Sequence, residues 1–265
     1  MSESASVQLQ IEHKTTSVPV AHSRDGSLIA VGAGSDIQVY DGATLEHLRT
    51  LGGCGGEISG LEFHPTGRKL LSQTRPVSGH FARQQFLQRF RLSSHTDAIM
   101  WAETSSDDKI VATSSWDKRL RLWSMESEET LHVLNDATNQ SWSGAFSNDG
   151  KLIAAGAGDA KVRVWRVATG ELVHTFSGFR QWVRSLAFSL ESALLAAGAA
   201  GGTLKVFNVG SGECAQTWQV DTGSSMSGSF LEIRLVQYTQ RGDLFFMSTD
   251  HEGRGFGYRT ADNRK

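Results

Sequence analysis

The sequence predicts an all-β fold made of repeated sheets, and two recurring landmarks support this prediction. The first is an aromatic residue that closes a run of alternating polar and apolar residues: Trp123 ends KRLRLW, Trp165 ends KVRVW and Phe207 ends TLKVF. Each of these residues follows the previous one by 42 positions. Tyr40, which ends DIQVY, lies 83 residues before Trp123, close to two such periods, and the skipped position falls at Phe81.

The second landmark is a strand-like run that leads into a turn. Phe63 in LEFHPTG, Phe146 in GAFSNDG and Phe188 in LAFSLES hold the same phase, and Thr104 occupies the remaining position of this series. Two landmarks that keep one period are the sequence signature of a repeat architecture.

Within one repeat, the pattern predicts four short strands separated by turns. Lys161–Arg166 alternates polar and apolar residues, as a half-buried strand does. Gly150 closes an Asn-Asp-Gly turn, where glycine can adopt a positive φ. The other three predicted strands of this repeat are Ser141–Phe146, Lys151–Gly156 and Glu171–Phe176. Four short strands in each period, with no helical pattern between them, describe one blade of a β-propeller.

We therefore predict one β-propeller domain over residues 1–265, with about six four-stranded blades, and with seven blades as the alternative. The last copy supplies only three strands and is displaced by an insertion that we place in the Gly/Ser-rich segment 221–229. Because propellers avoid open sheet edges, we expect the N-terminal strand, residues 5–12, to join the last blade and close the ring. The predicted repeat units are 13–53, 54–94, 95–136, 137–178, 179–220 and 230–259.

The composition favours an intracellular protein with no general affinity for polyanions. The 26 basic and 28 acidic side chains nearly cancel, so net charge favours neither nucleic acid nor an anionic membrane. Cys54 and Cys214 form no disulfide framework, which favours a reducing compartment. The N-terminus resembles no signal peptide, and no run approaches 18 apolar residues. We expect a cytoplasmic or nuclear location, without membrane association.

No catalytic or metal-binding motif emerges from the sequence. The nine histidines occur in no HxH or HExxH spacing, and there is no C-x-x-C pair. The glycine-rich run Gly52–Gly56 lacks the Gly-Lys-Ser/Thr of a phosphate-binding loop. The dense group Asp250-His251-Glu252 fits a solvated turn better than an acid/base site. We therefore predict a protein that is no enzyme, with no cofactor, no metal and no small-molecule substrate.

One repeat carries a motif that resembles the WD-repeat family. It begins with HTD at His95 and continues to SSWDKRLRLW, which ends at Trp123. In that family a histidine, a serine or threonine, a turn aspartate and a tryptophan form a buried hydrogen-bonded tetrad. The resemblance assigns these roles to His95, Ser115 (with Thr113 as the alternative), Asp117 and Trp123. A buried aspartate is stable only when its oxygens are paired, which gives the arrangement a physical reason.

The other repeats have lost parts of this motif. Ala137 and Phe179 stand where the next two copies would carry the histidine, and a Gly-Gly pair at Gly201 replaces the aspartate turn of the fifth copy. Asp159 and Trp165 remain in the fourth copy. We therefore expect most blades to be held mainly by apolar packing and by their hydrogen-bonded ladders.

The family resemblance also implies a place for partners, across one propeller face near the inner-strand starts and beside the turn aspartate. Tryptophan and arginine are the residues that most often anchor protein interfaces. The leading hypothesis is a non-catalytic scaffold or adaptor, within a multiprotein complex, that binds a peptide or a protein surface. For each tryptophan, packing between blades is the competing interpretation. The candidate partner-binding residues are Met100, Trp116, Trp142, Arg180, Trp182 and Arg184.

The segment 68–95 is basic and contains no Asp or Glu. Its run ARQQFLQRFRL is compatible with a basic amphipathic helix or with an irregular outer strand. An RNA- or nucleoprotein-associated subunit that uses this patch is the alternative function. The competing explanation is a degenerate blade whose arginines are solvated. The candidate patch residues are Arg75, Arg83, Arg89 and Arg91.

Overall fold

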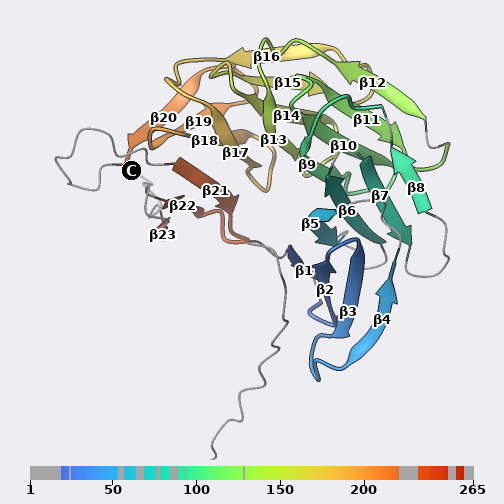
Figure 1. Ribbon diagram of the computed structural model, residues 1–265. Helices are drawn as coiled ribbons and strands as arrows, with labels where there is room; N and C mark the ends of the chain where they lie inside the picture. The colour runs from blue at the N-terminus through green and yellow to red at the C-terminus, as the bar shows by residue number, and fades with distance from the viewer. Residues whose placement is uncertain are drawn as a thin grey trace, which may run out of the picture. The chain divides into compact units, whose positions relative to one another are not determined.

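The computed structural model is built from antiparallel β-sheets (Figure 1). All regular elements in the described part of the chain are strands, which form five four-stranded sheets and one three-stranded sheet in chain order. This confirms the predicted all-β fold of successive four-stranded sheets. The chain divides into two compact units, residues 1–99 and 100–265. The structure describes residues 19–23, 25–52, 57–63, 69–75, 78–83, 89–92, 94–127, 129–220, 232–249 and 255–259.

The first unit contains two sheets whose facing sides form a small apolar core. Ile37 and Val39 of the first sheet pack with Ile58 and Leu70 of the second, and all four are buried. The strands of the first sheet are β1 (Val20–His22), β2 (Leu28–Ala33), β3 (Asp36–Asp41) and β4 (His47–Leu51). Those of the second are β5 (Glu57–Phe63), β6 (Lys69–Arg75), β7 (Ser78–Arg83) and β8 (Arg89–Leu92).

The basic segment of this unit forms strands. β7 pairs with β8 in antiparallel register, with Phe81 opposite Phe90. Phe81, where the aromatic period appeared to skip, therefore lies in the third strand of its sheet, as Tyr40 does in the first sheet. In the run ARQQFLQRFRL, residues 82–83 and 89–92 lie in strands, and the residues between them lie outside the described part of the chain.

The second unit contains four sheets that follow one another along the chain (Figure 1). The inner strands β13, β17 and β21 lie next to one another, and β12, β16 and β20 form the outer margin. The strands of the first two sheets are β9 (Ile99–Thr104), β10 (Ile110–Ser115), β11 (Leu120–Ser124), β12 (Thr130–Leu134), β13 (Ser141–Phe146), β14 (Leu152–Ala157), β15 (Val162–Arg166) and β16 (Leu172–Phe176). The remaining strands are β17 (Val183–Phe188), β18 (Leu194–Ala199), β19 (Thr203–Asn208), β20 (Cys214–Gln219), β21 (Glu232–Tyr238), β22 (Leu244–Thr249) and β23 (Gly255–Arg259).

Small residues on the second strands let neighbouring sheets pack closely. β14 has the sequence LIAAGA and β18 has LLAAGA. A Cβ placed on Gly156 would lie 2.7 Å from Val183 of the next sheet, and a Cβ on Gly198 would overlap Ile233. Glycine at these two positions therefore allows the inner strand of the following sheet to approach the backbone, as close packing requires.

A repeated serine–aspartate turn joins the first two strands of several sheets. In the fourth repeat, Ser147 Oγ donates to Asp149 Oδ1 at 2.7 Å and accepts from the Leu152 amide at 2.9 Å. Gly150 has φ +69°, as the predicted turn requires. The bond from Ser147 holds the pKa of Asp149 below its ordinary value, although burial opposes this shift. Ser23 and Ser105 make the same pair of bonds in their own turns.

The predicted insertion in the last copy and the predicted closing strand lie outside the described residues. Segment 221–229 lies within the undescribed residues 221–231, and segment 5–12 lies within the undescribed residues 1–18. The last sheet, β21–β23, has three strands among the described residues. Ring closure therefore stays a prediction.

Candidate functional site

A β-bulge occurs near the start of three neighbouring inner strands. In β13 the register shifts between Ser141 and Ser143, so that Trp142 is the extra residue. The same shift makes Arg184 the extra residue of β17 and Arg234 the extra residue of β21. A bulge bends the strand and re-aims the side chain of the added residue. Trp142, Arg184 and Arg234 therefore occupy equivalent positions at one end of three adjacent strands.

Three tryptophans form a row along this end of the second unit. Trp116, in the turn between β10 and β11, meets Trp142 edge-on, with ring centroids 5.2 Å apart and planes at 62°. Trp182 lies just before β17 and is parallel to Trp142, with a centroid distance of 5.4 Å and an interplanar angle of 4°. Aromatic pairs in these geometries contribute about 0.5–1.5 kcal/mol beyond the area that they bury. Trp116 and Trp142 are partly buried, whereas Trp182 is 45% exposed.

Arg184 joins this row to a charged cluster. Its guanidinium carbon lies 4.4 Å from the centroid of the Trp142 ring, within the range of a cation–π contact. Its Nη2 lies 3.6 Å from Glu232 Oε2, and Arg234 Nη2 lies 3.0 Å from the same oxygen. Burial lowers the pKa of Arg184, an effect that Glu232 opposes and Arg234 reinforces. One carboxylate thus faces two guanidinium groups at the end of the tryptophan row.

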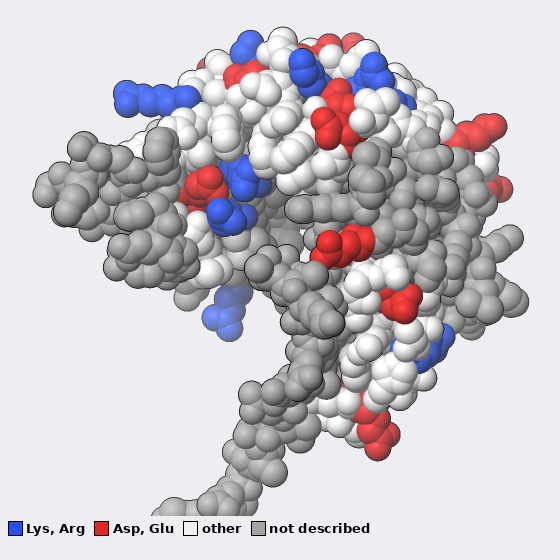
Figure 2. Space-filling view, viewed as in Figure 1, with Lys and Arg blue, Asp and Glu red and all other residues white. Residues whose placement is uncertain are grey.

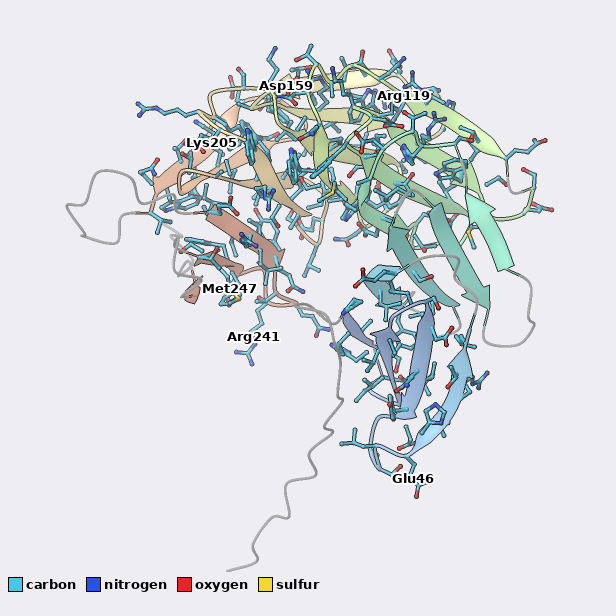
Figure 3. The ribbon with its side chains drawn as sticks, viewed as in Figure 1. Glu46, Arg119, Asp159, Lys205, Arg241 and Met247 are labelled. Atoms are coloured by element: carbon cyan, nitrogen blue, oxygen red, sulfur yellow. The ribbon has the colours of Figure 1, made fainter. Side chains whose placement is uncertain are left out.

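The structure brings four of the six candidate partner-binding residues into direct contact. These are Trp116, Trp142, Trp182 and Arg184. Met100 lies on β9 and is partly buried. Arg180 is exposed in the loop before β17. Figure 3 labels Arg119, in the turn between β10 and β11 that follows Trp116, and Asp159, in the equivalent turn between β14 and β15.

Glu232 and Arg234 were missed in the sequence, although a signal was present. Arg184 precedes Phe188 by four residues, and Arg234 precedes Tyr238 by the same interval, each after a β-branched residue. The predicted last unit, residues 230–259, contains both residues, but an insertion displaces it from the period of the other copies. The displaced phase of the last repeat therefore concealed the equivalence of the two arginines.

The third sheet carries the motif that resembles the family tetrad. The Trp123 indole Nε1 donates to Thr113 Oγ1 at 2.9 Å. Thr113 and Trp123 are diagonal neighbours across β10 and β11, since Val111 is opposite Trp123. Ser115 lies a further two residues along β10, and its Oγ accepts from the Asp117 amide at 3.1 Å within the turn. Thr113, which was the alternative to Ser115 in the sequence, is thus the residue that the indole reaches.

Comparison with known proteins agrees with this pattern. The family model described as WD domain, G-beta repeat matches residues 86–124, 128–166 and 170–208. This chain contains WD repeats. Each matched segment ends one residue after Trp123, Trp165 or Phe207, so the matches keep the 42-residue period.

Two curated proteins are similar to part of this chain. Protein FIZZY-RELATED 3 of Arabidopsis thaliana is 27% identical over 120 residues, which cover 45% of this chain and 25% of that protein. The B-type cell cycle switch protein ccs52B of Medicago truncatula is 26% identical over 120 residues, with the same two shares. The match therefore spans about a quarter of the length of these relatives.

The fourth WD repeat shows how a turn aspartate is held where Ala137 replaces the histidine. Asp159 accepts bonds of 3.2 and 2.7 Å from the two terminal nitrogens of Arg163. It also accepts from the amide and the hydroxyl of Thr138, at 3.1 and 3.0 Å. Burial raises the pKa of Asp159, but the bonds from Arg163 and Thr138 outweigh burial and hold the pKa below its ordinary value. Hydrogen bonding thus adds to the apolar packing that we expected to stabilise this blade.

The tryptophan of the same repeat also has a different hydrogen-bond acceptor. The indole of Trp165 donates to Asp136 Oδ2 at 2.9 Å, whereas the equivalent Trp123 donates to a threonine. In the third repeat the predicted histidine, His95, is buried, with 6% of its surface exposed. Different WD repeats of this chain therefore satisfy their buried polar groups with different partners.

Among the described residues, the remaining candidates form no second functional site. In the part of the chain that the structure describes, no group of three His, Cys, Asp or Glu side chains is arranged to hold a metal ion. Nor does any helix there have the length and apolar character needed to cross a membrane. The cluster at Asp250-His251-Glu252 lies outside the described residues. So do the side chains of Arg75, Arg83, Arg89 and Arg91.

Proposed function

We propose that this WD-repeat chain is a non-catalytic scaffold or adaptor inside the cell, within a complex of several proteins. It binds a peptide or a protein surface through the tryptophan row of Trp116, Trp142 and Trp182, together with Arg184. The observation that carries this proposal is the exposure of Trp182, which is 45% accessible while stacked parallel to Trp142. A large aromatic ring that is rigidly held and still exposed is typical of an interface anchor.

The surroundings of this row favour binding over a purely structural role. Aromatic side chains lose little conformational entropy on binding because they have only two rotatable side-chain bonds. Trp142 is contacted by Trp116, Trp182 and Arg184, so the row is already ordered before a partner arrives. Preorganisation of this kind lowers the entropic cost of association.

Known relatives support a protein partner in a general way. One relative is named a cell cycle switch protein, which favours a regulatory assembly as the setting for this chain. The RNA-associated alternative receives no comparable support. On the face shown in Figure 2, the described basic and acidic side chains are interspersed, and the four arginines of the candidate basic patch are not among the described side chains. We therefore propose protein, and not nucleic acid, as the partner.

Capture of partners by the tagged protein from its native cell tests this proposal. Trp182→Ala is the most direct variant, because its exposed ring can be removed with little change to the core. Leu131→Ala on the outer strand β12 is a matched control, since Leu131 is also exposed, at 44%. We expect Trp182→Ala to lose a defined set of captured proteins and Leu131→Ala to retain them, with similar melting temperatures. Identical sets from folded Trp182→Ala and wild type would show that the row is no binding site.

A further inference from the structure

The tryptophan row is flanked by more positive than negative charge. Arg184 and Arg234 approach the single carboxylate of Glu232, and Arg180 adds an exposed cation in the loop before β17. These side chains supply three positive charges and one negative charge. The turn that contains Trp116 adds one acid and two bases in the run DKR that follows it. The positive excess therefore extends along the row.

One further acid is already neutralised by a partner of its own. Asp159 is bound in a bidentate pair by Arg163, and the two side chains are only 9% and 5% exposed. Neither member of this pair is available to offset the arginines at the other end of the row. A partner with carboxylate groups is thus the electrostatic complement of the site.

Arg184 is positioned to bind a second carboxylate. The Trp142 ring orients its guanidinium group, which has five N–H donors in a fixed plane. Its contact with Glu232, at 3.6 Å, is longer than a hydrogen bond, whereas Arg234 approaches the same oxygen at 3.0 Å. Glu232 can therefore remain with Arg234 when Arg184 turns its donors toward another acceptor.

We propose that the tryptophan row binds an acidic peptide segment, in which an Asp or Glu carboxylate pairs with Arg184 and a neighbouring apolar side chain packs on Trp182. Glu232 competes with the peptide carboxylate for Arg184 and so limits the affinity. This inference rests on the proposed function, because it names the chemistry of the partner for the same site. It requires substitutions of Arg184 and Glu232, which are in contact, to change the affinity in opposite directions.

Selection of random decapeptides on the intact protein tests the chemistry without knowledge of the natural partner. The peptides carry amidated C-termini, so that only side-chain carboxylates are sampled. We expect wild type to enrich peptides with Asp or Glu beside an apolar residue. The affinity of the most enriched peptide is then measured by fluorescence anisotropy, beside its counterpart with Asn and Gln in place of Asp and Glu. We expect the affinity of the acidic peptide to exceed that of its amide counterpart by about tenfold or more, as for a charge-assisted hydrogen bond.

Substitutions of Arg184 and Glu232 distinguish recognition of the peptide carboxylate from competition by Glu232. Arg184→Gln should weaken the acidic peptide by about tenfold or more and remove its advantage over the amide counterpart. Glu232→Gln should bind the acidic peptide several-fold more tightly than wild type. Arg184→Lys provides a second test if Arg184→Gln folds poorly, because it keeps the charge but loses the planar donor fork. The control is Arg166→Gln, whose side chain is 58% exposed and lies 3.6 Å from Glu171; it should leave affinity unchanged.

Each contrary result has a distinct meaning. Selection of peptides without acidic residues, or of none, would overturn the acidic-partner inference. If the binding of such peptides still depends on Trp182, the proposed binding function stands, but the preference for an acidic partner does not. Weaker binding by Glu232→Gln would show that Glu232 contributes to recognition and would overturn its role as a competitor. The capture of cellular proteins by Trp182→Ala is measured independently of the peptide selection. Failure of the proposed binding function can therefore be distinguished from failure of the acidic-partner inference.

Discussion

Asp159 and Arg163 form a bidentate ion pair inside the fourth sheet, with 2.7 Å between Oδ2 and Nη2. Both side chains are less than one-tenth exposed, and Thr138 completes the set of donors to Asp159. A buried charge is tolerated only when it is paired and hydrogen-bonded. The pair therefore fixes the β14–β15 turn in a repeat where alanine replaces the histidine of the family motif.

Breaking this ion pair should destabilise the fold strongly. We expect Arg163→Met and Asp159→Asn each to lower the free energy of unfolding by about 3 kcal/mol, because each variant leaves a buried polar partner unpaired. The double variant should lose less than the sum of the two single variants, since it removes both charges together. Urea denaturation of the three variants measures this coupling. Additive losses would show that the two side chains act independently.

The stability of the fold should depend on the hydrogen bond from the Trp123 indole to the hydroxyl group of Thr113. Thr113→Val keeps the shape of the side chain but leaves the buried indole N–H without this acceptor, which should cost about 1–3 kcal/mol. Thr113→Ser keeps the hydroxyl and should lose less. Thermal unfolding followed by tryptophan fluorescence compares the two variants. Equal losses would mean that the methyl group, and not the hydrogen bond, determines the stability at this position.

Stability should fall as the pH rises from 4.5 toward 7, because of Glu103. Burial raises the pKa of Glu103 from its ordinary value of 4.5 to about 7, and the bond from the Phe146 amide opposes this shift only in part. In that pH range the folded state keeps a proton that the unfolded state releases, so stability declines until the folded pKa is passed. Glu103→Gln should flatten this decline, and the exposed Glu126→Gln should not. Denaturation midpoints measured at several pH values between 4 and 8 test both variants.

The N-terminal segment should stabilise the last sheet. We propose that residues 5–12 add a strand to β21–β23. In this sheet Leu235 lies opposite Met247, which is labelled in Figure 3, and the two side chains are 39% and 36% exposed. In the alternating run of this segment, Leu9→Asp should speed amide hydrogen exchange in β21–β23, whereas Gln10→Asp on the opposite face should have little effect. Unchanged exchange in Leu9→Asp would argue against this closure.

Local pattern predicted the strands well because strand formation depends on alternation and on turn chemistry. Ser141–Phe146 was predicted with the bounds that the structure has, and the other three strands of that sheet begin or end within one residue of their predicted positions. The Asn-Asp-Gly turn at Gly150 has the expected positive φ. In contrast, alternation does not reveal a bulge, so the bulged positions of Trp142, Arg184 and Arg234 became evident only in the paired sheets.

The sequence by itself determined the repeat, its period, the β class of the fold and the residue types suited to an interface. The tertiary structure decided which of those residues meet. Arg184 and Glu232 lie 48 positions apart in the chain, in two different sheets, and their contact depends on how β17 and β21 pack together. The same holds for the choice of Thr113 over Ser115, which the register of β10 and β11 decides. Contacts between sheets depend on register and on packing distance, and neither is encoded in the periodicity of a single strand.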